Sequence, residues 1–292
     1  MTSSTSLSTF PSCRLCGVHA LTSRFSALGC ILATCDRCGL VQLVAGASQD
    51  DLTVIYDADY FDHGKYVNDV AGRRERLRRL RWMEHCGVPV GAHVLEGGCA
   101  VGDFIAAAKN RYTMSGVDLA APAIAHAKQA MPDLTERLHV APLERPPFPQ
   151  GSFDAIVLWD VLEHLWNPRE VLAGLAGLLR RPGLILFSTP DIASPVARLL
   201  GRRWAFMTPP EHVSFLSPAA LHRLAASFGG KVCHRMNCGK WVNLGFLIYK
   251  LGRVFPGFVP ARAVKFLLRT AVSRVPLYVP TGDIMYAAIE VR

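Results

Sequence analysis

From about residue 91 onward the chain alternates short apolar runs with stretches of helical period, and this alternation restricts the possible folds more than any other feature. Such alternation is typical of a parallel sheet with helices on both faces. We therefore predict an α/β fold with a Rossmann-like, doubly wound, mostly parallel seven-stranded sheet. Ser217 and Pro218 are expected to cap and begin the last main helix. The expected strands cover 93–97, 113–120, 137–142, 152–160, 184–191, 231–236 and 283–291, and the main helices 102–110, 121–131, 167–180 and 217–230.

Acidic residues stand where the expected strands end. Glu96 closes the first strand, Asp118 the second, Asp160 the fourth and Asp191 the fifth. Ligands of open parallel sheets bind beyond the carboxyl ends of the strands. Apolar strands with acidic ends therefore predict a cofactor cleft at this edge of the sheet.

The glycine-rich loop "VLEGGCAVGDF", residues 94–104, narrows the choice of cofactor. A dinucleotide site needs a third glycine where this chain has Asp103, and an acid at a helix start repels a pyrophosphate. Glu96 and Asp103 instead suit a positively charged cofactor without phosphate. S-adenosylmethionine fits, because it carries a sulfonium, an ammonium and a ribose diol that Asp118 can bind.

Residues 90–240 resemble a class I S-adenosylmethionine-dependent methyltransferase. The resemblance is carried by "VLEGGCAVGDF", "GVDLA", "PFPQGSFDAIVLWDVLEHLWNP" and "RRPGLILFSTPD", which occur in the family's order. Ala100, Pro142 and Leu184 depart from the pattern, and Pro142 stands where the family often has an aspartate that contacts adenine. The resemblance implies a cofactor site made by Glu96, Gly98, Cys99, Ala100, Gly102, Asp118, Leu119, Trp159, Asp160 and Tyr66.

Two CxxCG motifs near the start of the sequence predict a metal site. Cys13 and Cys16 form the first pair, and Cys35 and Cys38 form the second. Each motif makes a tight turn that points two thiolates at one ion, and two such turns complete a tetrahedral site of four sulfurs. Because four thiolates leave no open position, we expect a structural Zn²⁺ ion in a small N-terminal ribbon.

The ribbon, the following "YDADYFDHGKY" and "PPEHVSFLS" together resemble bacterial sugar C-methyltransferases and related natural-product and glycan enzymes. The resemblance implies a small-molecule substrate, such as a nucleotide-linked sugar or another hydroxyl or keto intermediate of biosynthesis. It also implies His212 as a general base with Glu211 as its partner, and His164 is the second candidate. The tyrosine-rich segment is expected to cover the cofactor, with Tyr66 as its site residue.

Three segments follow from these patterns: a zinc ribbon at 1–48, a helical lid or linker at 49–90, and a methyltransferase domain at 91–292 with a helical insertion at about 240–282. No apolar run is long enough to span a bilayer, and no secretory signal is visible, so we expect a cytoplasmic protein. Residues 244–274 combine apolar faces with basic residues, which leaves a peripheral membrane contact open. The oligomeric state does not follow from the sequence.

Two other functions stay open. The net charge of +9 and the arginine-rich stretch 73–81 are compatible with a ribosomal RNA methyltransferase that recognises RNA through its ribbon. Aromatic residues do not interleave with the basic ones as a single-strand platform requires, so a nucleic acid partner is less favoured. A solvated helix face is the other interpretation of 73–81. A non-catalytic binding module is the second alternative function, although the cofactor motifs at Glu96, Gly98 and Asp118 are intact.

Overall fold

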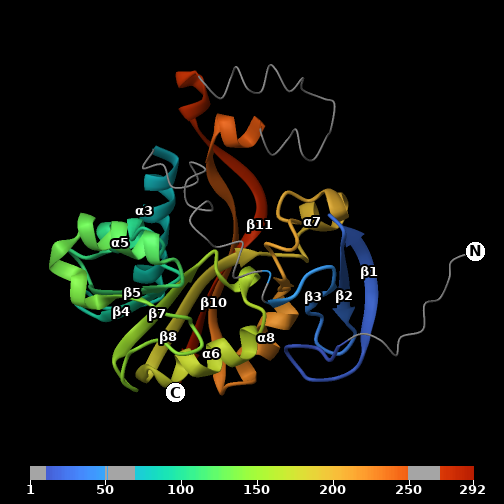
Figure 1. The fold of residues 1–292 in the computed structure, drawn as a ribbon, viewed down its shortest axis with the longest axis horizontal. Helices are drawn as coiled ribbons and strands as arrows, with labels where there is room; N and C mark the ends of the chain where they lie inside the picture. The colour runs from blue at the N-terminus through green and yellow to red at the C-terminus, as the bar shows by residue number, and fades with distance from the viewer. Residues whose placement is uncertain (1–10, 50, 52–69, 249–269) are drawn as a thin grey trace, which may run out of the picture.

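The computed structural model describes residues 11–49, 51, 70–248 and 270–292 (Figure 1). Tyr66 and the other residues of 52–69, which form part of the expected lid or linker 49–90, lie outside the described residues, as do residues 249–269 of the segment 244–274. The main sheet has seven strands in the order β10-β11-β8-β7-β4-β5-β6. Their bounds are β4 His93–Gly97, β5 Thr113–Asp118, β6 Leu138–Val140, β7 Phe153–Trp159, β8 Leu179–Pro190, β10 Gly230–Asn243 and β11 Pro276–Val291.

The strand directions confirm the predicted fold class. Strand β4 runs parallel to both β5 and β7, and β6 and β8 continue the parallel arrangement on the two sides. Strand β11 is antiparallel to β8 and to β10. The chain order reverses at β4, between β5 and β7, and this switch point is where open α/β sheets bind their ligands.

Helices cover both faces of the sheet because side chains on each strand alternate between two cores. Along β7, Ile156 and Leu158 pack with α6 Pro168–Gly177 and α8 Pro218–Ala226. The intervening Val157 and Trp159 pack in the other core, and Figure 1 shows the two helix layers on opposite sides. That second core contains α3 Val70–His85, α4 Asp103–Ala108 and α5 Ala121–Ala130.

Most predicted element ends agree with the structure. The Ser217 side chain accepts a hydrogen bond from the Ala220 amide, and Pro218 is the first residue of α8, as expected. Helix α6 ends at Gly177, three residues before the predicted end, and β8 begins at Leu179. The early start has a physical reason, since Leu179 pairs with Phe153 of β7 and thereby extends the ladder toward the helix.

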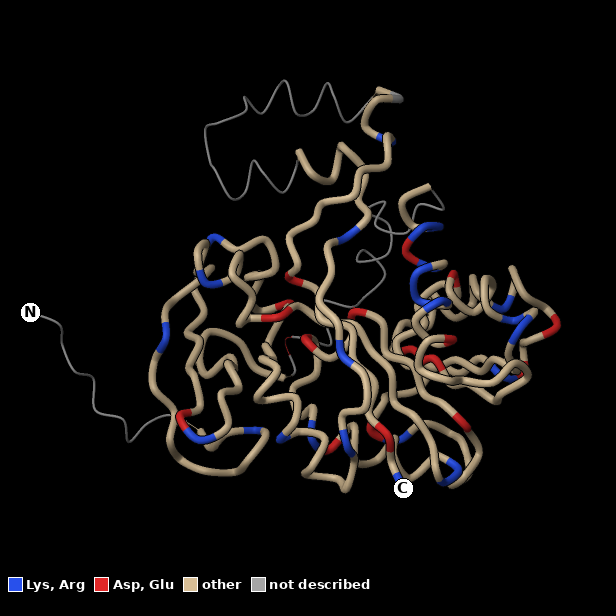
Figure 2. The backbone as a smooth tube through the Cα atoms, turned by 180° about the vertical axis from the view of Figure 1, so that it is seen from behind, with Lys and Arg blue, Asp and Glu red and all other residues tan. Residues whose placement is uncertain are grey.

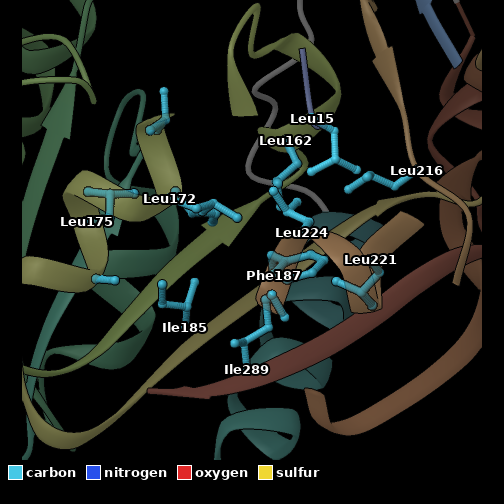
Figure 3. Packing of buried hydrophobic residues seen from close by; sticks show 14 of the residues in the cluster. Leu15, Leu162, Leu172, Leu175, Ile185, Phe187, Leu216, Leu221, Leu224 and Ile289 are labelled. Atoms are coloured by element: carbon cyan, nitrogen blue, oxygen red, sulfur yellow. The ribbon is translucent and has the colours of Figure 1, made fainter. Parts of the chain in front are cut away.

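A second sheet joins the N-terminal segment to the main domain. Its strands are β1 Leu21–Ala27, β2 Cys30–Cys35, β3 Val41–Ala45 and β9 Ser214–Phe215, in that order. The two-residue strand β9 pairs with β3 through Val41 and Gln42, and the sequence had not indicated it. The first CxxC loop also enters the main core: Figure 3 shows Leu15 beside Leu162 and Leu216.

The two strands that flank the expected insertion are longer than predicted. Strand β10 continues to Asn243 and β11 begins at Pro276, so strand structure occupies both ends of the segment 240–282. Figure 1 shows the two paired strands rising together above the rest of the sheet. Among the residues that the structure describes, no helix is long and apolar enough to cross a membrane.

Candidate functional site

Glu96 is the penultimate residue of strand β4 and is 4% exposed. Its Oε2 atom is buried and has no hydrogen-bond partner among the described residues. Burial, with a smaller contribution from the charges of Asp118 and Asp103, raises the pKa of Glu96 to about 8. A buried carboxylate oxygen without a partner is costly unless a ligand donates to it, so this position suits a cationic donor such as an ammonium.

The loop after β4 has the conformation of a ligand-binding turn. Gly98, Ala100 and Gly102 all have positive φ angles, of 70°, 47° and 78°. A side chain at Gly98 would place its Cβ 2.7 Å from a methyl group of Val161, so only glycine fits there. Ala100, the departure from the family pattern, takes the left-handed conformation at some cost in backbone strain.

The carboxylate of Asp118 holds this loop in place. The backbone amide of Ala100 donates to Asp118 Oδ2 at 2.8 Å, and the amide of Ala120 donates to Oδ1 at 2.9 Å. The end of β5 is thereby tied to the glycine-rich loop of the neighbouring strand. Leu119, the next residue, is exposed with 52% of its surface accessible.

Asp160 follows β7 with a positive φ of 58° and binds two cations. Arg79 Nη2 lies 2.9 Å from its Oδ2, Lys240 Nζ lies 3.0 Å from the same atom, and Ser188 donates to its Oδ1. Burial alone would raise the pKa of Asp160, but Lys240 and Arg79 hold it well below its usual range. Sequence reasoning missed both cations, and Lys240 has no local sequence signal.

The arginine-rich stretch 73–81 is therefore only partly a solvated face, because its inner arginines Arg78 and Arg79 form ion pairs within the chain. Helix α3 carries these residues, and Figure 2 shows its basic positions with an acidic one among them. Arg78 pairs with Glu75, Arg79 with Asp160, and Arg76 with Asp103 at 3.6 Å. Because α3 packs against β10 and β11, its inner arginines turn toward carboxylates of the same chain.

Two further residues of the predicted cofactor site, Trp159 and Cys99, are buried. Trp159 lies under the Arg79 guanidinium, 5.5 Å from it, and packs edge-on against Phe104. Cys99 is 4% exposed and lies against Gly116, where an added Cβ would meet its sulfur at 2.8 Å. Both side chains shape the packing beneath the loop. Tyr66 lies outside the described residues, so its predicted role stays a prediction.

The structure brings the two candidate histidines together. The rings of His164 and His212 meet edge to face with centroids 4.7 Å apart. His164 Nδ1 lies 2.8 Å from the carbonyl oxygen of Glu211, and His212 Nδ1 lies 2.7 Å from that of Phe206. Because a carbonyl only accepts, Nδ1 carries the proton in each neutral ring, and the basic lone pair is on Nε2. Glu211 contributes its backbone carbonyl to this arrangement.

Glu163 stands beside the histidine pair. It is 2% exposed, accepts a hydrogen bond from Thr189 Oγ1 at 2.9 Å, and burial raises its pKa to about 8. One ligand atom each from Glu163, His164 and His212 lie within 4.8 Å of one another, which makes this group able to hold a metal ion as well.

The four N-terminal cysteines also converge. Their sulfurs all lie within 4.8 Å of one another, with Cys13 and Cys38 3.4 Å apart and Cys16 and Cys35 3.5 Å apart. A Zn–S bond of about 2.3 Å places the sulfurs of a tetrahedral site about 3.8 Å apart, so the cluster fits zinc. Both CxxCG loops make the same turn, since the amides of Gly17 and Gly39 each donate to the carbonyl of the first cysteine.

The parallel sheet, the acidic loop at its switch point and the carboxylate that ends the next strand together define the arrangement of a class I methyltransferase. A family model described as a methyltransferase domain matches residues 71–234, which is more than half of the chain. The chain belongs to this methyltransferase domain family, which confirms the enzyme class predicted from the sequence.

Individual relatives agree with the family. The ubiquinone biosynthesis O-methyltransferase of Thiobacillus denitrificans is 27% identical over 161 residues, covering 52% of this chain and 69% of that protein. A probable S-adenosylmethionine-dependent methyltransferase of Mycobacterium tuberculosis is 35% identical over 122 residues, covering 41% of this chain and 42% of that protein. The second match thus spans less than half of its relative. These relatives support S-adenosylmethionine as the cofactor.

Solved structures show the same fold. The magnesium protoporphyrin IX methyltransferase of Synechocystis, solved with bound S-adenosylhomocysteine, superposes with a TM-score of 0.56 at 14% identity. The superposition covers 84% of this chain and 100% of that chain.

Proposed function

We propose that this protein transfers the methyl group of S-adenosylmethionine to a hydroxyl or keto intermediate of a biosynthetic pathway, with a sugar as the leading substrate class. The observation that carries the proposal is the buried Oε2 atom of Glu96, to which no residue in the described part of the chain donates, beside a loop fixed by Asp118. Glu96 would accept from the ammonium of the cofactor, and Asp118 would bind its ribose diol. Bound in this way, the cofactor supplies an electrophilic methyl group, and Gly98, Ala100 and Gly102 let the backbone approach it.

Positioning carries most of the barrier reduction in an in-line methyl transfer, and a base is needed only when the acceptor loses a proton. We assign that role to Nε2 of His212, with His164 as the second candidate. Their support is the hydrogen bond from each Nδ1 to a carbonyl, which places the basic lone pair on Nε2 of neighbouring rings. The carbonyl of Phe206 orients His212, a role that the sequence resemblance had given to Glu211.

A phenolic acceptor is the second candidate within the same reaction class. Its support is the similarity to proteins named ubiquinone biosynthesis O-methyltransferase, several of which match over about half of this chain. An RNA acceptor loses part of its earlier support, because Arg78 and Arg79 are engaged with carboxylates of the chain itself. A structural Zn²⁺ ion on the four cysteines belongs to the proposal as well.

The first experiment is calorimetric titration with S-adenosylmethionine and S-adenosylhomocysteine, with NAD as the control. We expect binding of the first two at micromolar concentrations and none of NAD. If neither S-adenosylmethionine nor S-adenosylhomocysteine binds, the proposed site is refuted and a non-catalytic module is favoured. A panel of nucleotide-linked ketosugars, simple sugars and catechols then identifies the acceptor class by release of S-adenosylhomocysteine.

The base is tested with matched histidine variants. His212→Ala should leave cofactor affinity unchanged and lower kcat by roughly 10²- to 10⁴-fold, the usual range for a general base. His164→Ala separates the two candidates, and His126→Ala, on the exposed face of α5, serves as the control. Normal turnover of His212→Ala would remove His212 as the base. A loss of activity on chelation that excess Mg²⁺ or Mn²⁺ restores without any change in zinc content would instead assign a metal to Glu163, His164 and His212.

A further inference from the structure

The histidine pair is attached to the N-terminal sheet by a series of backbone hydrogen bonds. The amide of Leu43, on β3, donates to the carbonyl of Val213 at 2.9 Å, and the amide of Val213 donates to the carbonyl of Glu163 at 2.8 Å. Val213 directly follows His212, and Glu163 directly precedes His164. A ribbon strand therefore holds the backbone beside both histidines, and each of these bonds is between segments distant in sequence.

Arg14 connects this series to the first cysteine loop. It stands between Cys13 and Cys16, and its Nη2 donates to the carbonyl of Leu43. Its guanidinium carbon also lies 3.6 Å from the centre of the Trp166 ring. Since Trp166 comes two residues after His164, one side chain contacts both the strand beside His212 and the segment that carries His164.

The surroundings fix the Arg14 side chain in this geometry. Its backbone amide donates to Gln42 Oε1 at 2.9 Å, and Gln42 is fully buried and donates in turn to the carbonyl of Ser12. The adjacent Leu15 is 2% exposed and packs in the main core beside Leu162, as Figure 3 shows. The half-buried Arg14 guanidinium over the Trp166 ring makes a cation–π contact that restrains the orientation of that ring.

We propose that Arg14 is a positioning residue, through which the metal-binding first cysteine loop sets the orientation of the His164 and His212 rings. The inference rests on the proposed function only in what it says about turnover. Arg14 touches neither cofactor nor reacting atoms in this role; it acts through Trp166 and Leu43.

The test compares Arg14→Met, which keeps the length of the side chain but removes charge and donors, with Arg14→Lys in the zinc-loaded full chain. Ring signals of histidine labelled with ¹³C at Cε1 are assigned with His164→Gln and His212→Gln. We expect Arg14→Met to shift the signals of both rings, to keep its zinc content and cofactor affinity, and to lower kcat roughly 10- to 100-fold. Arg14→Lys should restore part of the shift and of the rate, because it still places a cation over Trp166.

Arg24→Met is the control, because Arg24 lies on β1 of the same sheet over its neighbour Phe25. It should leave both histidine signals unchanged. Should Arg14→Met fail to bind zinc or to fold, Trp166→Leu removes the same contact from the other side and should shift the His164 signal. Unchanged histidine signals in a folded, zinc-loaded Arg14→Met or Trp166→Leu protein overturn the proposal. The spectra need no methyl acceptor. If the proposed function is wrong, the wild-type protein will show no turnover, but Arg14→Met will still shift the histidine signals.

Discussion

Lys240 Nζ lies 3.0 Å from Asp160 Oδ2, although the two residues are 80 positions apart, Lys240 on strand β10 and Asp160 directly after strand β7. Arg79 reaches the same oxygen from helix α3, so two cations share one carboxylate. This contact ties the end of β7 to β10 and to α3. It also sits beside the loop where the cofactor is proposed to bind.

Asp160→Asn should destabilise the protein, because it leaves the half-buried Arg79 and Lys240 without their counter-charge. Removing one partner of a fully buried pair costs about 3–5 kcal/mol, and we expect part of that loss for this half-buried cluster. The matched control is Asp154→Asn, whose ion pair with Arg180 is exposed and worth about 1 kcal/mol or less. Urea unfolding measures both. Equal losses of unfolding free energy in the two variants would show that the Asp160 cluster stabilises the protein no more than an exposed ion pair does.

Cofactor binding should release a proton at neutral pH. Free Glu96 has a pKa of about 8, so it is largely protonated at pH 7, and binding of an ammonium group requires its ionised form. Affinity should therefore rise as pH increases toward 8 and level off above it. Calorimetry in buffers of different ionisation enthalpy counts the protons.

Variants of two buried glutamates show which carboxyl group releases that proton. Glu96→Gln should bind more weakly and abolish the release, whereas Glu163→Gln should keep it, even though burial raises the pKa of Glu163 to about 8 as well. Proton-neutral binding by the wild-type protein at pH 7 would exclude Glu96 as the partner of the ammonium.

Asp118→Ala should weaken S-adenosylmethionine binding for two reasons. It removes the proposed partner of the ribose diol, and it frees the amides of Ala100 and Ala120, whose bonds to an ionised carboxylate are worth about 1.5–3 kcal/mol each. We expect a loss in affinity of roughly 10- to 100-fold or more, together with faster hydrogen exchange of the Ala100 amide. Asp133→Ala, at an exposed ion pair with Lys109, should change neither quantity.

Removal of zinc should loosen the segment that carries His212 but leave the cofactor loop intact. The four cysteines hold the turns around β2, β3 depends on those turns, and β9 pairs with β3. After chelation, hydrogen exchange should increase at 21–45 and at 212–216, while 93–118 keeps its protection and cofactor still binds. Loss of cofactor binding under gentle chelation would show instead that the ribbon helps to build the cofactor site.

Patterns that are local in sequence predicted most of the fold and part of the site. Strand runs, caps such as Ser217 and the CxxCG turns depend on neighbouring residues, and each of them agrees with the structure. Strand β9 escaped prediction because two residues carry no periodicity, and its partner β3 is far away in the chain. The ion pairs of Arg79 and Lys240 escaped it because composition shows a charge but not which carboxylate the tertiary fold brings to it.

The pairing of Val41 with Phe215 also governs the order in which the molecule can be assembled. A ribosome synthesises the chain from its N-terminus. The cysteines and strands β1 to β3 therefore emerge before the residues of β9 have been synthesised. During that interval β3 presents an open edge that includes the apolar Val41 and Leu43, and such edges recruit other chains. Early capture of metal can shape the ribbon of a nascent chain, but only arrival of the segment that carries His212 closes its edge.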